Sequence, residues 1–258
     1  MLRTLEQLVK PYYRYRGYYP ARIHGQDFRL DPYHTRFWRR AARGLWEPEL
    51  FTLLRRHLQP DRVFCDIGAW IGPSTIYAAR LCKRVICFEP DPVAYRYLSW
   101  NIELNRLTNV SPFCLALAPR MGIETLASFG GELGDSMSSL LKIDEATETA
   151  TALTLEWTRF IELANPGRID LIKLDIEGGE FDLLPTMADY LATELPVLYL
   201  STHAPFLESS MRRSRLQALA DLLAFYPHCY DQHFKPASME DLASEDSAEH
   251  FRTFLLSP

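Results

Sequence analysis

The sequence contains no apolar run near the roughly 18–20 residues that a membrane-spanning helix needs. No apolar segment typical of a signal peptide follows Met1. Its five cysteines form no C-x-x-C pair, and Cys65 and Cys87 lie inside apolar segments typical of core strands. Buried thiols of this kind act as small apolar groups in a reducing compartment. We therefore expect a cytoplasmic chain without a membrane span.

Acidic residues outnumber basic ones, but the two signs are unevenly spread. The net charge is −5, yet residues 1–62 carry 13 Lys and Arg against 6 Asp and Glu. Near the N-terminus, Arg14, Arg16 and Arg22 alternate with tyrosines. Such a pattern can bind nucleic acid or an anionic surface, but so many aromatic side chains usually become buried. We therefore expect no nucleic-acid partner, and an arm that packs on its own acidic domain or, in a homodimer, on a second subunit.

Length and composition indicate one α/β domain with an extension. With 258 residues, of which 47% are hydrophobic, the natural division is an N-terminal extension over 1–45 and a domain over 46–258. Within the extension and the start of the domain, the patterns predict a helix over 2–9, a hairpin over 21–30 and one or two helices over 37–58.

A strand–turn–helix–strand unit over residues 63–91 organises the domain. The apolar run 63–65 predicts a buried strand, and Pro73 opens the following helix, where a missing N–H costs nothing. A second apolar run over 85–88 ends in Glu89. This βαβ pattern is typical of proteins that bind a nucleoside-bearing ligand.

The turn between strand and helix lacks the third glycine of a dinucleotide-binding loop. Only Gly68 and Gly72 are present, and Asp66 precedes them. A carboxylate at this position suits an ammonium group and would repel a diphosphate, while Glu89 can accept hydrogen bonds from two ribose hydroxyls. An ammonium and a ribose without phosphate describe S-adenosylmethionine. The alternative is a βα turn whose glycines are purely structural.

Several ordered blocks resemble the FkbM-type class I S-adenosylmethionine-dependent methyltransferases. These blocks are LWEPELF, DIGAWIG, FEPDP, NIELNRLTNV and IDLIKLDIEGGE, within residues 46–203. The resemblance implies an α/β, Rossmann-like, seven-stranded and mostly parallel sheet with an antiparallel C-terminal edge strand. It also implies methyl transfer to a hydroxyl of a sugar or secondary metabolite. The residues expected to bind the methyl donor are Glu47, Asp66, Gly68, Ala69, Trp70, Gly72, Ser74, Thr75, Glu89, Pro90 and Asp175.

Charged residues in the segment 169–180 are a second indication of a functional site. A strand alternation would place Lys173, Asp175 and Glu177 on one side. A central parallel strand is normally apolar on both faces, so these charges need partners. In the resembled family this motif lies beside the sulfonium and the acceptor. For Lys173 and Glu180 we favour a structural ion network instead.

His203 follows the apolar run 197–200 and is a candidate general base, because imidazole titrates near neutral pH. We expect Asp175, Glu177 and His203 to be catalytic, with His203 as the base and Asp175 orienting the acceptor or the base. The reverse assignment stays open. Asp175 and Glu177 could hold a divalent metal, but no full oxygen shell is visible, so no metal is assigned.

The remaining patterns predict a third strand over 110–117, whose end would contact the adenine, and a helix over 153–164. The loosely patterned residues 130–151 suggest a lid or substrate loop, in which Asp135 and Ser138 could line the pocket. Two strands, over 229–234 and 253–256, would close the sheet.

Three departures from the family pattern keep other functions open. Trp70 stands where the family usually has Asn, Glu156 where it has Asp, and Ser201 where many members carry an acid. A catalytically silent binding or scaffold subunit is therefore the main alternative. An NAD-dependent oxidoreductase is less favoured because of the missing phosphate-loop glycine.

Overall fold

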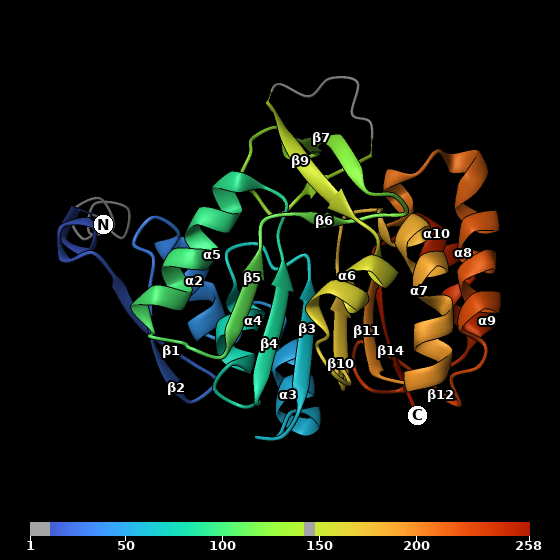
Figure 1. The fold of residues 1–258 in the computed structure, drawn as a ribbon, viewed down its shortest axis with the longest axis horizontal. Coiled ribbons are helices and arrows are strands. Elements are labelled where there is room, and N and C mark those ends of the chain that lie inside the picture. The colour runs from blue at the N-terminus through green and yellow to red at the C-terminus, as the bar shows by residue number, and fades with distance from the viewer. Residues whose placement is uncertain (1–10, 142–147) are drawn as a thin grey trace.

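An eight-stranded sheet forms the centre of the molecule (Figure 1), in a computed structural model that describes residues 11–141 and 148–258. From one edge to the other, its strands are β13 (Pro236–Ala237), β12 (His228–Asp231), β14 (Arg252–Ser257), β11 (Val197–Thr202), β10 (Leu171–Leu174), β3 (Val63–Ile67), β4 (Arg84–Phe88) and β5 (Val110–Phe113). Strands β11, β10, β3, β4 and β5 are parallel neighbours. The expected α/β, Rossmann-like architecture is confirmed.

The C-terminal side of the sheet differs from the expectation in two details. Strand β14 is antiparallel, as expected, but it lies between β11 and β12 rather than at the edge. Its residues Phe254, Leu255 and Leu256 are all buried, which suits an interior position. In addition, β13 pairs with β12 and makes an eighth strand.

Helices cover both faces of this sheet. One face carries α3 (Pro48–His57), α4 (Pro73–Ala78) and α5 (Pro92–Leu104). The other face carries α6 (Trp157–Ala164), α7 (Glu180–Glu194) and α8 (Ser209–Leu223). Three short helices lie beside α8, namely α9 (Met239–Leu242), α10 (Glu245–Glu249) and η1 (Ala204–Phe206). Strand alternation divides the core, because Phe64 packs with the first group and Cys65 with the second. Among the described residues, no helix is long and apolar enough to cross a membrane.

The N-terminal hairpin is joined to the sheet domain through α5. Strands β1 (Tyr19–Ile23) and β2 (Gln26–Leu30) confirm the predicted hairpin, and α2 (Thr35–Ala42) and α3 the predicted pair of helices. The side chain of Asn105 bonds both the N–H and the carbonyl of Arg29. Asn101 accepts the N–H of Asp31 and donates to the carbonyl of Ile71. Asn105, at the end of α5, thus fixes the hairpin to that helix, and Asn101 joins the residue after the hairpin to the turn after β3. The helix expected over 2–9 lies outside the described residues.

A second, four-stranded sheet lies above the carboxyl ends of the parallel strands (Figure 1). Its strands, in spatial order, are β6 (Ala116–Leu117), β9 (Thr149–Leu155), β7 (Gly122–Ser128) and β8 (Ser138–Ser139). Two predictions were therefore wrong. The third strand of the main sheet ends at Phe113, since Ala116 and Leu117 pair with β9. The helix expected over 153–164 begins only at Trp157, because burial alternates residue by residue along β9, as a strand requires.

Candidate active site

One cavity of about 850 Å³ opens at the carboxyl ends of β3, β4, β10 and β11, beneath the small sheet. In open α/β sheets this edge is the usual ligand site. The volume is within the range of small-molecule pockets. Of the predicted site residues, those that line it are Glu47, Gly68, Ala69, Trp70, Ser74, Glu89, Pro90, Asp175, Glu177 and His203. Asp66, Gly72 and Thr75 do not line it.

The turn after β3 requires glycine at two positions. Gly68 has φ +85°, and a Cβ there would lie 1.8 Å from the carbonyl oxygen of Asp175. Gly72 has φ +89°, and a Cβ would lie 2.5 Å from Cδ1 of Leu98. Both values lie in the left-handed region that favours glycine. The first glycine therefore allows the β3 turn to touch the end of β10, and the second allows α4 to begin against α5.

Asp66 lies below the cavity floor and is completely buried. Its Oδ2 accepts hydrogen bonds from the hydroxyls of Ser74 (2.6 Å) and Thr75 (2.7 Å). Its Oδ1 lies 3.3 Å from Nζ of Lys173. The carboxylate thus fixes the start of α4 and neutralises a buried ammonium. The sequence predicted that Asp66 contacts the ammonium group of a ligand directly. Its position under the cavity floor does not favour that contact.

Glu89 is the buried acid that does line the cavity. Its Oε2 accepts the N–H of Trp70 (2.7 Å) and its Oε1 the N–H of Asp91 (2.9 Å). Burial raises the pKa of Glu89 to about 7, although these two N–H groups act in the opposite direction. The side chain is therefore held in one orientation at the tip of β4.

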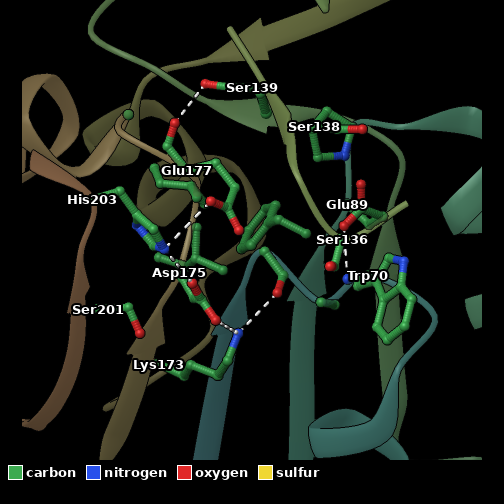
Figure 2. Close-up of a pocket in the computed structure, with 18 of the residues that line it drawn as sticks. Trp70, Glu89, Ser136, Ser138, Ser139, Lys173, Asp175, Glu177, Ser201 and His203 are labelled. Carbon is green, nitrogen blue, oxygen red and sulfur yellow. Dashed lines mark hydrogen bonds and ion pairs between the residues drawn. The ribbon is translucent and has the colours of Figure 1, made fainter. Parts of the chain in front are cut away.

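Trp70 lies at the side of the cavity, near Glu89 and away from His203 (Figure 2). Its indole N–H donates to the carbonyl of Gly134 at 3.0 Å, and its ring packs edge-on against Phe37. Its backbone is left-handed, with φ +50°. The large side chain thus ties the β3 turn to the segment before β8, and the cavity stays open.

Across the cavity, four charged side chains form a continuous chain of ion pairs (Figure 2). The buried Nζ of Lys173 donates to the carbonyl of Gly68 at 2.9 Å and lies 3.4 Å from Oδ2 of Asp175. Nε2 of His203 lies 3.4 Å from both Oδ1 of Asp175 and Oε2 of Glu177. The ion network that we favoured for Lys173 is present. It also reaches two of the residues expected to be catalytic.

Glu177 takes its place through a turn, not through strand alternation. Strand β10 ends at Leu174, and Glu177 has φ +52°. The hydroxyl of Ser139, on the small sheet, donates to its carbonyl at 2.7 Å. Gly178 follows with φ +97°. This turn brings the carboxylate to the imidazole of His203.

Glu180 holds the other side of the imidazole. It is completely buried, and its Oε1 lies 3.3 Å from Nδ1 of His203 and accepts the backbone N–H of the same residue at 2.6 Å. Its Oε2 accepts the N–H of Gly178. We assigned Glu180 to a structural ion network, and it therefore also positions the candidate catalytic residue His203.

Mutual interactions shift the protonation of this group. Burial alone would lower the pKa of His203, but Glu180, Asp175 and Glu177 raise it to about 9. Burial would raise the pKa of Asp175, yet Lys173 and His203 hold it below the ordinary value. Burial raises the pKa of Glu177 to about 7. An imidazole with this pKa is protonated at neutral pH and has no lone pair for a proton. The protonation of His203 therefore favours a carboxylate as base, a role that the sequence left open for Asp175.

Glu47 approaches the same cavity from the start of α3, where it precedes Pro48 with φ +38°. Burial, together with Asp175, raises its pKa to about 7, against the effect of Lys173. Its carboxylate thus faces the interior and does not serve as a simple N-terminal charge for α3.

Asp91 is a residue that the sequence reasoning missed. Its Oδ1 caps α5 by accepting the N–H groups of Val93 and Ala94. Its Oδ2 accepts the N–H of Gly134 (2.6 Å) and the hydroxyl of Ser138 (2.7 Å). An Asp before Pro signals a helix cap, but nothing local in the sequence predicts the second pair of bonds. Asp135 and Ser138, which were expected to line the pocket, do so.

Comparison with known proteins supports a family assignment. Residues 66–241 match the model of the Methyltransferase FkbM domain, which is more than half of the chain. A curated relative, "Methyltransferase 1" of Beauveria bassiana (strain ARSEF 2860), is 26% identical over 150 residues, covering 50% of this chain and 59% of the relative.

Two further similarities are weaker or shorter. The tRNA (guanine(37)-N(1))-methyltransferase of Saccharomyces cerevisiae is 33% identical over 66 residues, covering 24% of this chain and 13% of the relative. The matched stretches therefore span only part of the curated relatives' own lengths. A crystal structure of a methyltransferase FkbM from Methylobacillus flagellatus KT aligns with a TM-score of 0.46 and 13% identity, covering 84% of this chain and 60% of that one.

Proposed function

The chain belongs to the FkbM methyltransferase family, and on that premise we propose that it transfers a methyl group from S-adenosylmethionine to a hydroxyl of a small molecule or glycan. One observation carries the proposal. A single cavity joins Glu89, at the tip of β4, to Asp175, Glu177 and His203, at the tips of β10 and β11. We call the part of the cavity around Glu47, Trp70 and Glu89, with Asp66 beneath it, the donor half. The part around Asp175, Glu177 and His203, with Glu180 behind it, is the acceptor half.

In the donor half, Glu89 is the residue suited to the ribose. Each of its oxygens accepts one backbone N–H and retains further acceptor capacity toward the cavity. The apolar residues Leu115 and Leu117 line the same space and suit an adenine ring. When bound, S-adenosylmethionine supplies an electrophilic methyl group. Ribose and base recognition of this kind needs no phosphate contact.

We assign the amine of the donor to Glu47 rather than to Asp66. Glu47 lines the cavity, whereas Asp66 is buried beneath it and already paired with Lys173. Asp66 then acts as a positioning residue, because it holds Ser74, Thr75 and the ammonium of Lys173 in place.

In the acceptor half, we assign the role of proton acceptor to Glu177. A base works best when its pKa lies near the working pH, and burial places that of Glu177 at about 7. Asp175 and the protonated His203 would orient the hydroxyl. As the acceptor oxygen bonds to the methyl carbon, the methyl–sulfur bond would break with its electron pair left on sulfur, and the hydroxyl proton would pass to Glu177. The acceptor must lie in line with the methyl group, which is what the common cavity permits.

Isothermal titration of the purified chain with S-adenosylmethionine tests the donor half. We expect one site per chain, with affinity reduced in Glu89→Gln and retained in Glu177→Gln. Formation of S-adenosylhomocysteine with a panel of sugars and secondary-metabolite alcohols tests the acceptor half. A tRNA transcript belongs in the panel because a tRNA methyltransferase is among the relatives.

Each alternative predicts a different result. The absence of any heat with S-adenosylmethionine would contradict the proposal and support a scaffold subunit. A fluorescence change on adding NADH would instead support an oxidoreductase. Methylation of tRNA, with no alcohol methylated, would keep methyl transfer but replace the acceptor.

A further inference from the structure

Three potential metal ligands converge in the acceptor half. One ligand atom each from Asp175, Glu177 and His203 lies within 4.8 Å of the other two, and Nε2 of His203 is 3.4 Å from both carboxylates. They come from the end of β10, the turn after it and the end of β11. The fold, rather than one local motif, therefore assembles the group, and all three side chains face the cavity.

The backbone is shaped to place these atoms together. Glu177 adopts a left-handed conformation that is uncommon for a residue with a side chain, and the bond from Ser139 to its carbonyl stabilises the turn. Strained positions of this kind persist where the surrounding structure fixes them, and they are common at functional sites. An extended residue would direct the carboxylate elsewhere.

The imidazole is oriented as metal-binding histidines are. Its Nδ1 faces Oε1 of the buried Glu180 at 3.3 Å, which leaves Nε2 directed at Asp175 and Glu177. Nδ1 makes no hydrogen bond in this orientation, and a small rotation of the ring would let it donate to Glu180, which is the usual support behind a histidine ligand. The side chain of His203 is only 8% exposed, so this orientation is fixed by the protein and not by solvent.

The carboxylates around His203 carry more negative charge than the neighbouring cationic side chains balance. Three carboxylates, those of Asp175, Glu177 and Glu180, surround the single imidazole. Lys173 reaches Asp175 but divides its charge with Asp66. Glu180 is completely buried, and the side chains of Asp175 and Glu177 are only 23% and 16% exposed, so this excess of negative charge is costly unless a cation joins it.

We propose that Asp175, Glu177 and His203 bind one divalent metal ion that coordinates the acceptor hydroxyl. This inference rests on the proposed function. Metal–ligand bonds of about 2.0–2.2 Å would place neighbouring donor atoms roughly 3.0–3.5 Å apart, which agrees with both 3.4 Å separations. One imidazole and two carboxylates suit Mn²⁺, Fe²⁺ or Zn²⁺ better than Ca²⁺, which prefers oxygen ligands throughout.

The ion would refine the proton transfer described above. Its binding displaces the proton from Nε2 of His203. A hydroxyl coordinated to a divalent ion would lose its proton more readily, and Glu177, bound to the ion through one oxygen, would accept that proton on the other. The oxygen then forms its bond to the methyl carbon while the carbon–sulfur bond breaks and its electron pair stays on sulfur.

Titration of the metal-stripped chain with Mn²⁺ and, separately, Zn²⁺ tests the site. Binding of Mn²⁺ is followed by the loss of the free-ion electron paramagnetic resonance signal, and that of Zn²⁺ by calorimetry. We expect one ion per chain, and an affinity at least tenfold lower in Asp175→Asn, Glu177→Gln and His203→Gln. Glu180→Gln should also weaken binding, on the order of 10–100-fold, because it releases the imidazole.

Two controls separate this inference from the proposed function. Glu124→Gln removes another acid that lines the cavity, outside the three ligands, and should bind the ion normally. Glu89→Gln should lose affinity for S-adenosylmethionine and keep the metal. If neither ion binds the wild-type chain at millimolar concentration, or if the ligand variants bind as the wild type does, the metal site is wrong. Donor binding would be unaffected by that result.

Discussion

The two halves of the cavity satisfy their buried charges in different ways. In the donor half, the carboxylates of Asp66 and Glu89 accept hydrogen bonds of 2.6–2.9 Å from backbone N–H groups and hydroxyls, and Asp66 also lies 3.3 Å from Lys173. In the acceptor half, Asp175 and Glu177 each lie 3.4 Å from Nε2 of His203. Groups fixed by neutral donors are preorganised, whereas groups held by one another respond to a proton, a cation or a substrate. The first half is built to bind and the second to react.

The largest effect should come from removing the proposed proton acceptor. Glu177→Gln is expected to lower turnover about 10²–10⁴-fold, because the amide cannot take the hydroxyl proton. Affinity for S-adenosylmethionine should stay near the wild-type value. Single-turnover assays with saturating donor measure the first quantity and calorimetry the second. Asp182→Asn, another acid that lines the cavity, is the matched control. If Glu177→Gln turned over as fast as the wild type, Glu177 would not be the proton acceptor, and the functional distinction between the donor half and the acceptor half would be lost.

Gly68→Ala should damage the contact through which the two halves meet. The added Cβ would lie 1.8 Å from the carbonyl of Asp175, so the turn after β3 and the end of β10 must separate. We expect the free energy of unfolding to fall by about 3 kcal/mol or more. Gly167→Ala is the control, since it also has positive φ but nothing within 4 Å, and should cost about 1 kcal/mol. If chemical denaturation gave the same loss of unfolding free energy for both variants, backbone strain alone, and not the close contact with Asp175, would explain why position 68 requires glycine.

Glu89→Gln tests the donor half alone. The amide keeps the size of the side chain but loses the charge that strengthens its hydrogen bonds to ribose hydroxyls. We expect affinity for S-adenosylmethionine to fall about 10–100-fold, which corresponds to the roughly 1.5–3 kcal/mol of a charge-assisted bond. Turnover at saturating donor should change much less. A fall in turnover with unchanged affinity would mean that Glu89 belongs to the chemistry.

The pH dependence of turnover gives the smallest expected effect. Glu177 must be ionised to accept a proton, and burial raises its pKa to about 7. In metal-free enzyme with saturating donor, the rate should therefore fall about tenfold per pH unit below 7 and level off above it. The pKa of Glu89 is also raised to about 7. Its titration in the free enzyme would affect kcat/KM, so kcat is the quantity to measure, because it reports the enzyme with substrates bound. A flat profile between pH 5.5 and 8 would contradict this assignment.

The local sequence predicted the ends of β3 and β4 well. Strands β3 and β4 are short and apolar on both faces, and they end in an acid and a glycine turn, so their carboxyl tips could be located directly. Strand alternation failed at Glu177, because the strand had ended and the backbone had turned left-handed. The helical prediction failed over 153–155, where a sheet that pairs distant segments replaced the expected helix. Long-range pairing leaves no reliable local signal.

By itself, the sequence determined the α/β architecture, the edge of the sheet that carries the cavity and several of the residues that line it, because strand endings and glycine turns are local properties. Only the tertiary structure decided that Asp66 lies under the floor, that Glu180 supports His203 and that three carboxylates meet one imidazole. Those facts depend on distances between segments far apart in the chain, and the pKa values that choose among acid, base and metal ligand depend on those distances and on burial.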